Sequence, residues 1–120
     1  MEKSDSLDDL RQALAHFASA RDWDQFHSPK NLAMALIAEA AELVEHFQWL
    51  TEEQSRALAP DKLGEVRLEL ADILIYLVRI ADKLEVDLIA AARHKMRINE
   101  TRYPAEQVRG DARRATEYSR

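Results

Sequence analysis

The chain has 120 residues and a formal net charge of −5, and it contains no cysteine and only two glycines. These values exclude disulfides and thiolate metal sites, disfavour a nucleic-acid binder, which usually has a basic surface, and favour helices over a β fold that needs many turns. We expect one cytoplasmic all-α domain, because the amino terminus lacks a signal-peptide pattern and the most apolar stretch, residues 73–78, is too short to span a membrane.

The first half of the chain predicts two helices separated by an aromatic loop. Ser6 is a suitable N-cap for a first helix that extends to about residue 21. The loop covers residues 22–28. Pro29 is favoured at the first position of a second helix, which is expected to extend to about Trp49. The rings of the loop are Trp23, Phe26 and His27.

The second half predicts two more helices and a tail. Residues 51–60 are a polar connection, and a third helix is expected over about 61–84. Asp87 is placed to cap a fourth helix over about 88–102. Residues 105–120 are polar and mixed in charge, so this segment is expected to be a frayed or extended tail.

Two acidic pairs stand inside apolar helices: Glu39 with Glu42, and Glu69 with Asp72. Residues three apart lie on one helix face, so each pair presents two carboxylates side by side. Glu39 falls within the leucine stripe of the second helix, and Asp72 is the only charge in residues 70–78. Because an unpaired charge on a core-facing surface is unfavourable, the four acids predict a compensating cation.

The ligand type favours Mg²⁺, with Mn²⁺ as a substitute. Hard divalent ions take carboxylate oxygens, whereas Zn²⁺ prefers His and Cys. A di-iron bundle would use Glu-x-x-His motifs, and the chain has none. A structural salt-bridge cluster is the alternative, but no basic residue shares the stripe of Glu39. Because Mg²⁺ held by protein acids usually serves a substrate phosphate, a phosphorylated substrate is expected.

Other residues indicate how such a substrate could be held. The chain has no glycine-rich phosphate loop, so side chains such as Lys95 or Arg102 would have to contact the phosphates together with the metal. The aromatic rings that bracket the second helix could stack on a nucleobase. For any single ring, packing in the core or the loop is the more ordinary role. These rings are Trp23, Phe26, His27 and Trp49.

The acidic pairs are separated by 26 residues and are accompanied by several further motifs. Together they resemble the signature of the all-α nucleoside triphosphate pyrophosphohydrolases, the MazG-like superfamily, and most closely its dCTP pyrophosphatase branch. The resemblance covers about residues 10–104. The further motifs are Arg21-Asp-Trp-Asp-Gln-Phe-His27, Pro29-x-Asn31-Leu32, Phe47-Gln-Trp49, Asp72-Ile-Leu-Ile-Tyr-Leu-Val78, Lys95-Met-x-Ile-Asn99 and Arg102-Tyr-Pro104.

The resemblance implies a four-helix bundle over residues 1–104 that assembles into dimers or a dimer-of-dimers tetramer. It implies Mg²⁺ at the four acids and hydrolysis of dCTP, or a modified dCTP, to the monophosphate and pyrophosphate. The residues that it implies for substrate binding are Trp23, His27, Trp49, Tyr76, Lys95 and Asn99.

Three questions stay open at the level of sequence. Glu42 and Glu65 are both candidates for the catalytic base that would orient or deprotonate the attacking water. The substrate could instead be dUTP or a damaged purine triphosphate, because an apolar or stacking pocket rejects analogues only modestly. A non-catalytic helical interaction module, stabilised by a metal at the same acids, is the alternative from another class.

Overall fold

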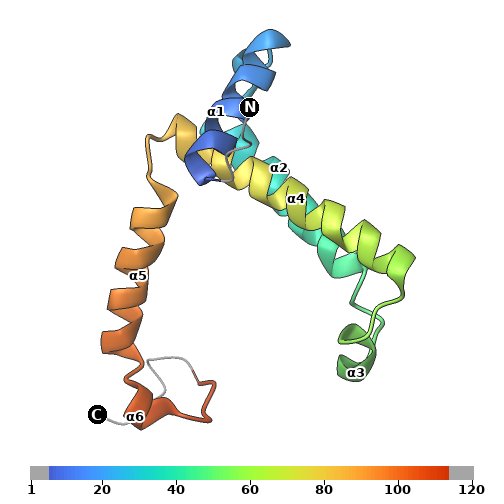
Figure 1. Cartoon of the computed structure of the whole chain (residues 1–120), viewed down its shortest axis with the longest axis vertical. Helices are drawn as coiled ribbons and strands as arrows, with labels where there is room; N and C mark the ends of the chain where they lie inside the picture. Colours follow the sequence, from blue (N-terminus) through green and yellow to red (C-terminus); the bar gives the residue numbers. More distant parts are fainter. Residues whose placement is uncertain (1–5, 114–120) are drawn as a thin grey trace. The chain divides into compact units, whose positions relative to one another are not determined.

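The computed structural model describes residues 6–113, and all regular elements within that range are helical. This confirms the predicted all-α class. The described chain forms one compact unit up to Val86 and a second from Asp87 onward. The elements, labelled in Figure 1, are α1 (Leu7–Ala20), the 3₁₀ turn η1 (Asp24–Phe26), α2 (Pro29–Glu45), α3 (Glu52–Ser55), α4 (Pro60–Lys83), α5 (Leu88–Arg102) and α6 (Ala105–Val108).

The helices begin where their capping residues are placed. The Ser6 hydroxyl accepts a hydrogen bond from the Asp9 amide at the start of α1. Ser28 caps α2 in the same way, and Asp87 accepts from the Ala90 amide at the start of α5. Such side chains satisfy amides that have no partner within the helix. The predicted starts of the first, second and fourth helices are therefore confirmed.

Three details differ from the predicted elements. α2 ends at Glu45 and not near Trp49, because the hydrogen bonds that follow span three residues and form turns. One of them joins the Phe47 amide to the Val44 carbonyl at 2.9 Å. The polar connection contains α3, which begins with a reciprocal capping box between Thr51 and Gln54. The predicted tail contains α6, whereas residues 114–120 lie outside the described range.

The first unit is built on α4, its longest helix. α2 lies along α4 for most of its length, and α1 packs near the carboxyl-terminal end of α4 (Figure 1). Arg11 of α1 donates a hydrogen bond to Asp82 of α4 at 3.2 Å and helps to hold this contact. The core is small, because the apolar residues that are fully buried in the described chain are Ala18, Leu32, Val66, Val78 and Ala81.

The second unit contains α5 and α6, which are separated by Pro104. Proline is common just after a helix because it cannot continue one. The prediction that residues 1–104 form one domain stays a prediction. None of the helices within residues 6–113 combines the length and the apolar character needed to cross a bilayer.

Candidate metal and nucleotide site

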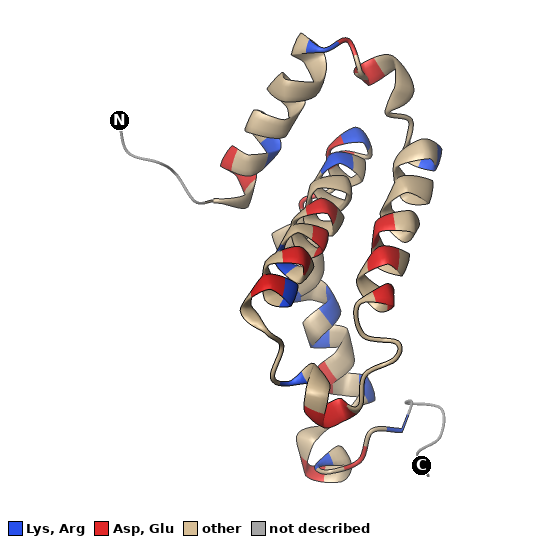
Figure 2. Ribbon diagram, turned by 90° about the vertical axis from the view of Figure 1, so that its right-hand side faces the viewer, with Lys and Arg blue, Asp and Glu red and all other residues tan. Residues whose placement is uncertain are grey.

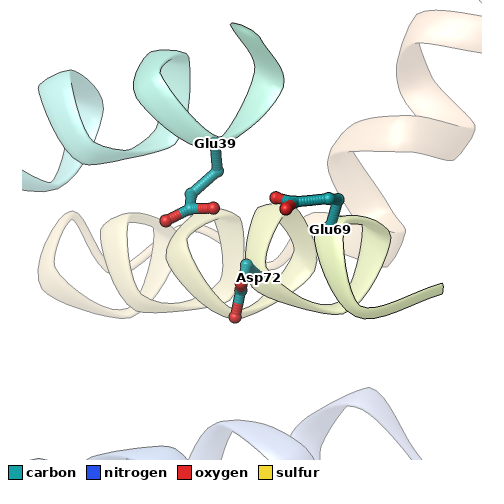
Figure 3. A group of neighbouring side chains, drawn as sticks. All are labelled: Glu39, Glu69 and Asp72. Carbon is teal, nitrogen blue, oxygen red and sulfur yellow. The ribbon is translucent and has the colours of Figure 1, made fainter. Parts of the chain in front are cut away.

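Three carboxylates meet where α2 and α4 lie side by side. Glu39 projects from α2, and Glu69 and Asp72 project from successive turns of α4 (Figure 3). One carboxylate oxygen from each residue lies within 4.8 Å of the other two. Figure 3 shows that Glu39 and Glu69 point toward one another across the helix pair. The packing of α2 on α4 therefore brings one member of the first predicted acidic pair, Glu39, together with both members of the second.

Two oxygens of this cluster have no hydrogen-bond donor. Glu39 Oε2 and Glu69 Oε2 are shielded from solvent and have no hydrogen-bond partner among the described residues. Buried polar atoms are nearly always paired, so two unpaired acceptors beside each other are unusual. Burial, together with the neighbouring carboxylates of Glu42, Asp72 and Glu69, raises the pKa of Glu39 to about 7. The cluster is therefore short of positive charge.

A hard divalent cation fits this donor set. The three residues offer carboxylate oxygens only, which suits Mg²⁺ or Mn²⁺ better than a metal that prefers nitrogen or sulfur. A cation would also supply the partner that the two buried oxygens lack. Glu39, Glu69 and Asp72 are the residues that would hold it.

Glu42 lies beside this group. It is exposed, and its carboxylate is close enough to Glu39 to raise the pKa of that group. Glu42 makes no ion pair with another residue in the described part of the chain. Acidic residues lie along both α2 and α4 in this region, where they are drawn in red (Figure 2). The arrangement leaves Glu42 available either to contact a cation from the open side or to act on a water molecule.

Glu65, the other candidate base, has different surroundings. Its carboxylate is 3.6 Å from the Lys62 ammonium and 3.8 Å from Nδ1 of His46. Lys62 also contacts the same ring nitrogen at 3.2 Å, and Nε2 of His46 is 3.8 Å from Glu69. A basic pair thus borders the acid cluster on the Glu65 side. Sequence reasoning missed the role of His46, although its place one turn after Glu42 was a usable signal.

The aromatic loop forms a second group, at the end of the helix pair where α2 begins and α4 ends. Trp23 packs edge-on against Phe17 of α1 at 5.7 Å between ring centroids, and its centroid is 6.3 Å from that of His27. The Asn31 side-chain amide donates to the Phe26 carbonyl at 3.0 Å and ties the loop to the start of α2. Trp23 and His27, two of the predicted substrate-binding residues, are thus neighbours on an anchored loop.

The other predicted binding residues lie in three places. Tyr76 is on α4, one turn after Asp72, and is half-buried. Trp49 lies in the turns after α2 and is 87% exposed, so its ring is free to contact a ligand or another chain. Lys95 and Asn99 lie on α5 in the second unit, four residues apart, and therefore share a face of that helix.

The structure also reveals a buried arginine that sequence reasoning did not single out. Arg79 of α4 has a side chain that is only 4% exposed. It donates to Asp24 Oδ1 at 2.9 Å and contacts Nδ1 of His27 at 3.2 and 3.3 Å. The available signal was its spacing, because Arg79 follows Asp72 by seven residues and so lies on nearly the same helix face.

Comparison with known proteins assigns the chain to a family. Residues 35–117 match the MazG-like family. The chain belongs to the MazG-like family. The resemblance predicted from the motifs is therefore confirmed. The family match includes both acidic pairs and all of α4 and α5, whereas the aromatic loop lies before its first residue.

Individual relatives of this MazG-like chain are enzymes. It is 45% identical over 114 residues to dCTP pyrophosphatase 1 of Homo sapiens, across 93% of this chain and 67% of that protein. The enzyme of the same name from Mus musculus is 44% identical over 117 residues, across 96% and 69%. These relatives confirm the prediction of a hydrolytic enzyme related to the dCTP pyrophosphatases.

The fold has a solved counterpart. A crystal structure of a pyrophosphatase from Archaeoglobus fulgidus superposes with a TM-score of 0.79 at 37% sequence identity, over 87% of this chain and 97% of that one. The likeness extends the sequence relationship to three dimensions.

Proposed function

We propose that this chain is a Mg²⁺-dependent nucleoside triphosphate pyrophosphohydrolase that acts on dCTP or a modified dCTP. The observation that carries the proposal is the cluster of Glu39, Glu69 and Asp72, with two unpaired buried oxygens, in a chain closely similar to dCTP pyrophosphatases. The products would be the nucleoside monophosphate and pyrophosphate.

The acids would prepare the phosphate end of the site. Glu39, Glu69 and Asp72 would hold the cation, and a bound Mg²⁺ would neutralise charge on the phosphate oxygens. Mn²⁺ would serve in its place. The half-buried position of Glu39 and Glu69 between two packed helices would limit the movement of their oxygens before substrate arrives.

A carboxylate beside the cluster would act on the water. Water attacks a phosphorus atom next to the oxygen that bridges the α- and β-phosphates, the bond from that phosphorus to the bridging oxygen breaks, and the water proton passes to a base. We favour Glu42 over Glu65 for this role, because Glu65 already faces the Lys62 ammonium and His46. Glu42 has no such competing cation among residues 6–113.

The nucleoside would be held by the aromatic groups. Trp23 and Trp49 present ring faces for stacking, and His27 and Tyr76 provide polar contacts. Lys95 and Asn99 of α5 stay predicted substrate-binding residues. Assembly into a homodimer or a tetramer, in the cytoplasm, completes the proposal, and the exposed apolar side chains of α2 and α4 support the assembly.

A pyrophosphate-release screen tests the substrate. Purified protein would be assayed with dCTP, a 5-substituted dCTP, dUTP and purine triphosphates, each with Mg²⁺, with Mn²⁺ and with a chelator. We expect the highest kcat/KM on a cytidine nucleotide and no turnover with the chelator. Preference for dUTP or a damaged purine would change the substrate, and no release from any nucleotide would leave the non-catalytic module as the better reading.

A pair of matched variants tests the acids. Glu39→Gln keeps the shape and removes the charge, and we expect it to lower Mg²⁺-dependent kcat/KM at least about 100-fold. Glu45→Gln makes the same change at an exposed position on the same helix and should keep activity near that of the wild type. Near-normal turnover by folded Glu39→Gln protein would overturn the assignment.

A further inference from the structure

Arg79 is the one charged residue that is fully buried within the described range, and all of its contacts converge on one loop and one neighbouring acid. Its guanidinium pairs with Asp24 at 2.9 Å and with Asp82 at 3.4 Å. Two of its nitrogens lie within 3.3 Å of Nδ1 of His27. A buried charge with this many partners is strongly fixed, because losing either carboxylate would remove part of the compensation for its charge.

We propose that Arg79 is a positioning residue that holds His27 as its Nε2–H tautomer, so that this ring donates a hydrogen bond to an acceptor atom on the nucleoside part of the bound nucleotide. The inference rests on the proposed function and deepens it, by naming what sets the chemistry of one binding residue.

The tautomer follows from the donor inventory. A guanidinium has only N–H donors and no acceptor, and it stays charged at any ordinary pH. Nδ1 of His27, which faces two guanidinium nitrogens of Arg79, must therefore present a lone pair. A neutral imidazole carries its proton on the other nitrogen in that case. The Nε2–H bond then points away from Arg79 and has no hydrogen-bond acceptor among the described residues.

The charges around His27 keep the ring neutral. Burial lowers the pKa of His27, and the positive charges of Arg79 and Lys83 lower it further, against an opposing effect of Asp24. Asp24 is itself paired with both cations, at 2.9 Å to Arg79 and 2.8 Å to Lys83. A proton on Nδ1 would have to face the guanidinium directly. The ring is therefore a directed donor and not a cation.

The position of the ring suits a nucleoside. His27 adjoins Trp23, whose ring is a stacking candidate. On α4, Asp72, Tyr76 and Arg79 follow one another at spacings of four and three residues, so they share one face over two turns, about 10 Å along the axis. The acid cluster lies at one end of this row and His27 at the other. A nucleotide with its phosphates at the acids would extend its sugar and base toward His27.

Nitrogen NMR of the ligand-free protein tests the tautomer directly. Uniformly ¹⁵N-labelled wild type should show His27 with an unprotonated Nδ1 and a protonated Nε2, assigned by the signals lost in His27→Asn. Arg79→Met should give a mixture of tautomers and a higher His27 pKa, while Arg79→Lys should restore part of the wild-type pattern. Arg67→Met, at an exposed position on the same helix, should leave the His27 signals unchanged.

A protonated Nδ1 in the wild type, or wild-type signals in folded Arg79→Met, would overturn the proposal. If Arg79→Met does not fold, the wild-type spectrum and a comparison of two His27 variants decide. Glutamine can place an amide N–H near the Nε2 position and asparagine near Nδ1, so we expect KM for dCTP to rise about tenfold more in His27→Asn than in His27→Gln. Equal KM values would contradict the donor role.

The two proposals fail separately. A wild type that releases no pyrophosphate from any nucleotide would overturn the proposed function, and with it the nucleoside contact of His27. The ligand-free spectrum would still show whether Arg79 sets the tautomer. Normal activity combined with equal KM values for the two His27 variants would instead overturn only the role of His27 as a donor.

Discussion

Glu39 is the acid of the cluster whose pKa is raised most clearly by its surroundings. It projects from an apolar helix face, its Oε2 has no donor within the described chain, and burial with three nearby carboxylates raises its pKa to about 7. In the unfolded chain the same group titrates near 4.5. A group whose pKa is raised on folding contributes stability that is present below its unfolded value and is lost as pH rises through its folded value.

We therefore expect the metal-free protein to lose stability as pH rises from about 5 to 8 because Glu39 must ionise in the cluster. Glu39→Gln cannot ionise, so the amount by which its melting temperature exceeds that of the wild type should grow over this range. Thermal melting in chelator at a series of pH values measures the difference. A difference that is constant with pH would contradict the raised pKa.

The stabilisation of the protein by divalent ions should increase with pH, whereas the stability of the metal-free protein should decrease. Mg²⁺ and a proton compete for the same carboxylates, so the rise in wild-type melting temperature on adding Mg²⁺ should be larger at pH 8 than at pH 6. Glu39→Gln should show a much smaller Mg²⁺ effect at both values. The measurement is thermal melting, without any nucleotide, of protein that has been stripped of metal with a chelator, freed of the chelator and then titrated with MgCl₂.

The sequence predicted part of this site for identifiable reasons. Glu39 and Asp72 interrupt apolar surfaces, so their anomaly can be read from helical periodicity alone. The structure shows that Glu69 joins them and that Glu42 stands beside them. The contacts of Arg79 could not be read in this way, because Asp24 and His27 lie more than fifty residues earlier and meet Arg79 only when the loop folds onto α4.

At the level of the helices, α4 carries a glycine within its second turn. Gly64 lies inside the helix with ordinary backbone angles, and a Cβ built on it would meet nothing within 4 Å. Glycine in a helix interior is less favourable than alanine, because the unfolded chain has more freedom to lose. Gly110 differs, because its φ of +79° is one that alanine adopts only with strain.

We expect Gly64→Ala to raise the free energy of unfolding by about 0.5–1 kcal/mol. Gly110→Ala, the matched change at a position with positive φ, should give no gain or a loss. Urea unfolding of both variants at one protein concentration measures the effect. A destabilised Gly64→Ala protein would show that a neighbouring surface closes over this position.

The helices themselves were largely predictable, and the exceptions have local causes. Ser6, Ser28 and Asp87 are strong caps, so the starts they set could be read from the sequence. The end of α2 was placed too late because Phe47 and Trp49 continue the apolar pattern of the helix, whereas the backbone hydrogen bonds there are those of turns. α3 was missed although Thr51 and Gln54 have the spacing of a capping box, because a one-turn helix carries too few residues to show periodicity.

For the whole molecule, the small core and the exposed apolar side chains belong together. Few apolar residues are fully buried in the described chain, whereas large ones on the long helices remain exposed. Exposed apolar area of this kind marks an interaction surface in a soluble protein. On α2 and α4 these residues are Met34, Ile37, Val44, Leu63, Leu68, Leu70, Leu74 and Leu77.

Association of identical chains should therefore depend on this surface. Leu68→Glu places a charge on it, and we expect a lower mass by light scattering than the wild type at equal concentration. Lys30→Glu, which adds negative charge at an exposed polar position, should keep the wild-type mass. A wild type that is monomeric at high concentration would contradict the proposed assembly.

One consequence concerns how α4 can change in evolution. Because Asp72 and Arg79 lie on the same uninterrupted helix, inserting a single residue between them would rotate one relative to the other by about 100° and separate them by about 1.5 Å more. Asp72 in the acid cluster and Arg79, which holds the aromatic loop, would then face different directions. Descendants of this sequence can exchange side chains within residues 73–78. Insertions and deletions should instead accumulate in the connection over residues 51–59, because a change of length there does not rotate Asp72 relative to Arg79.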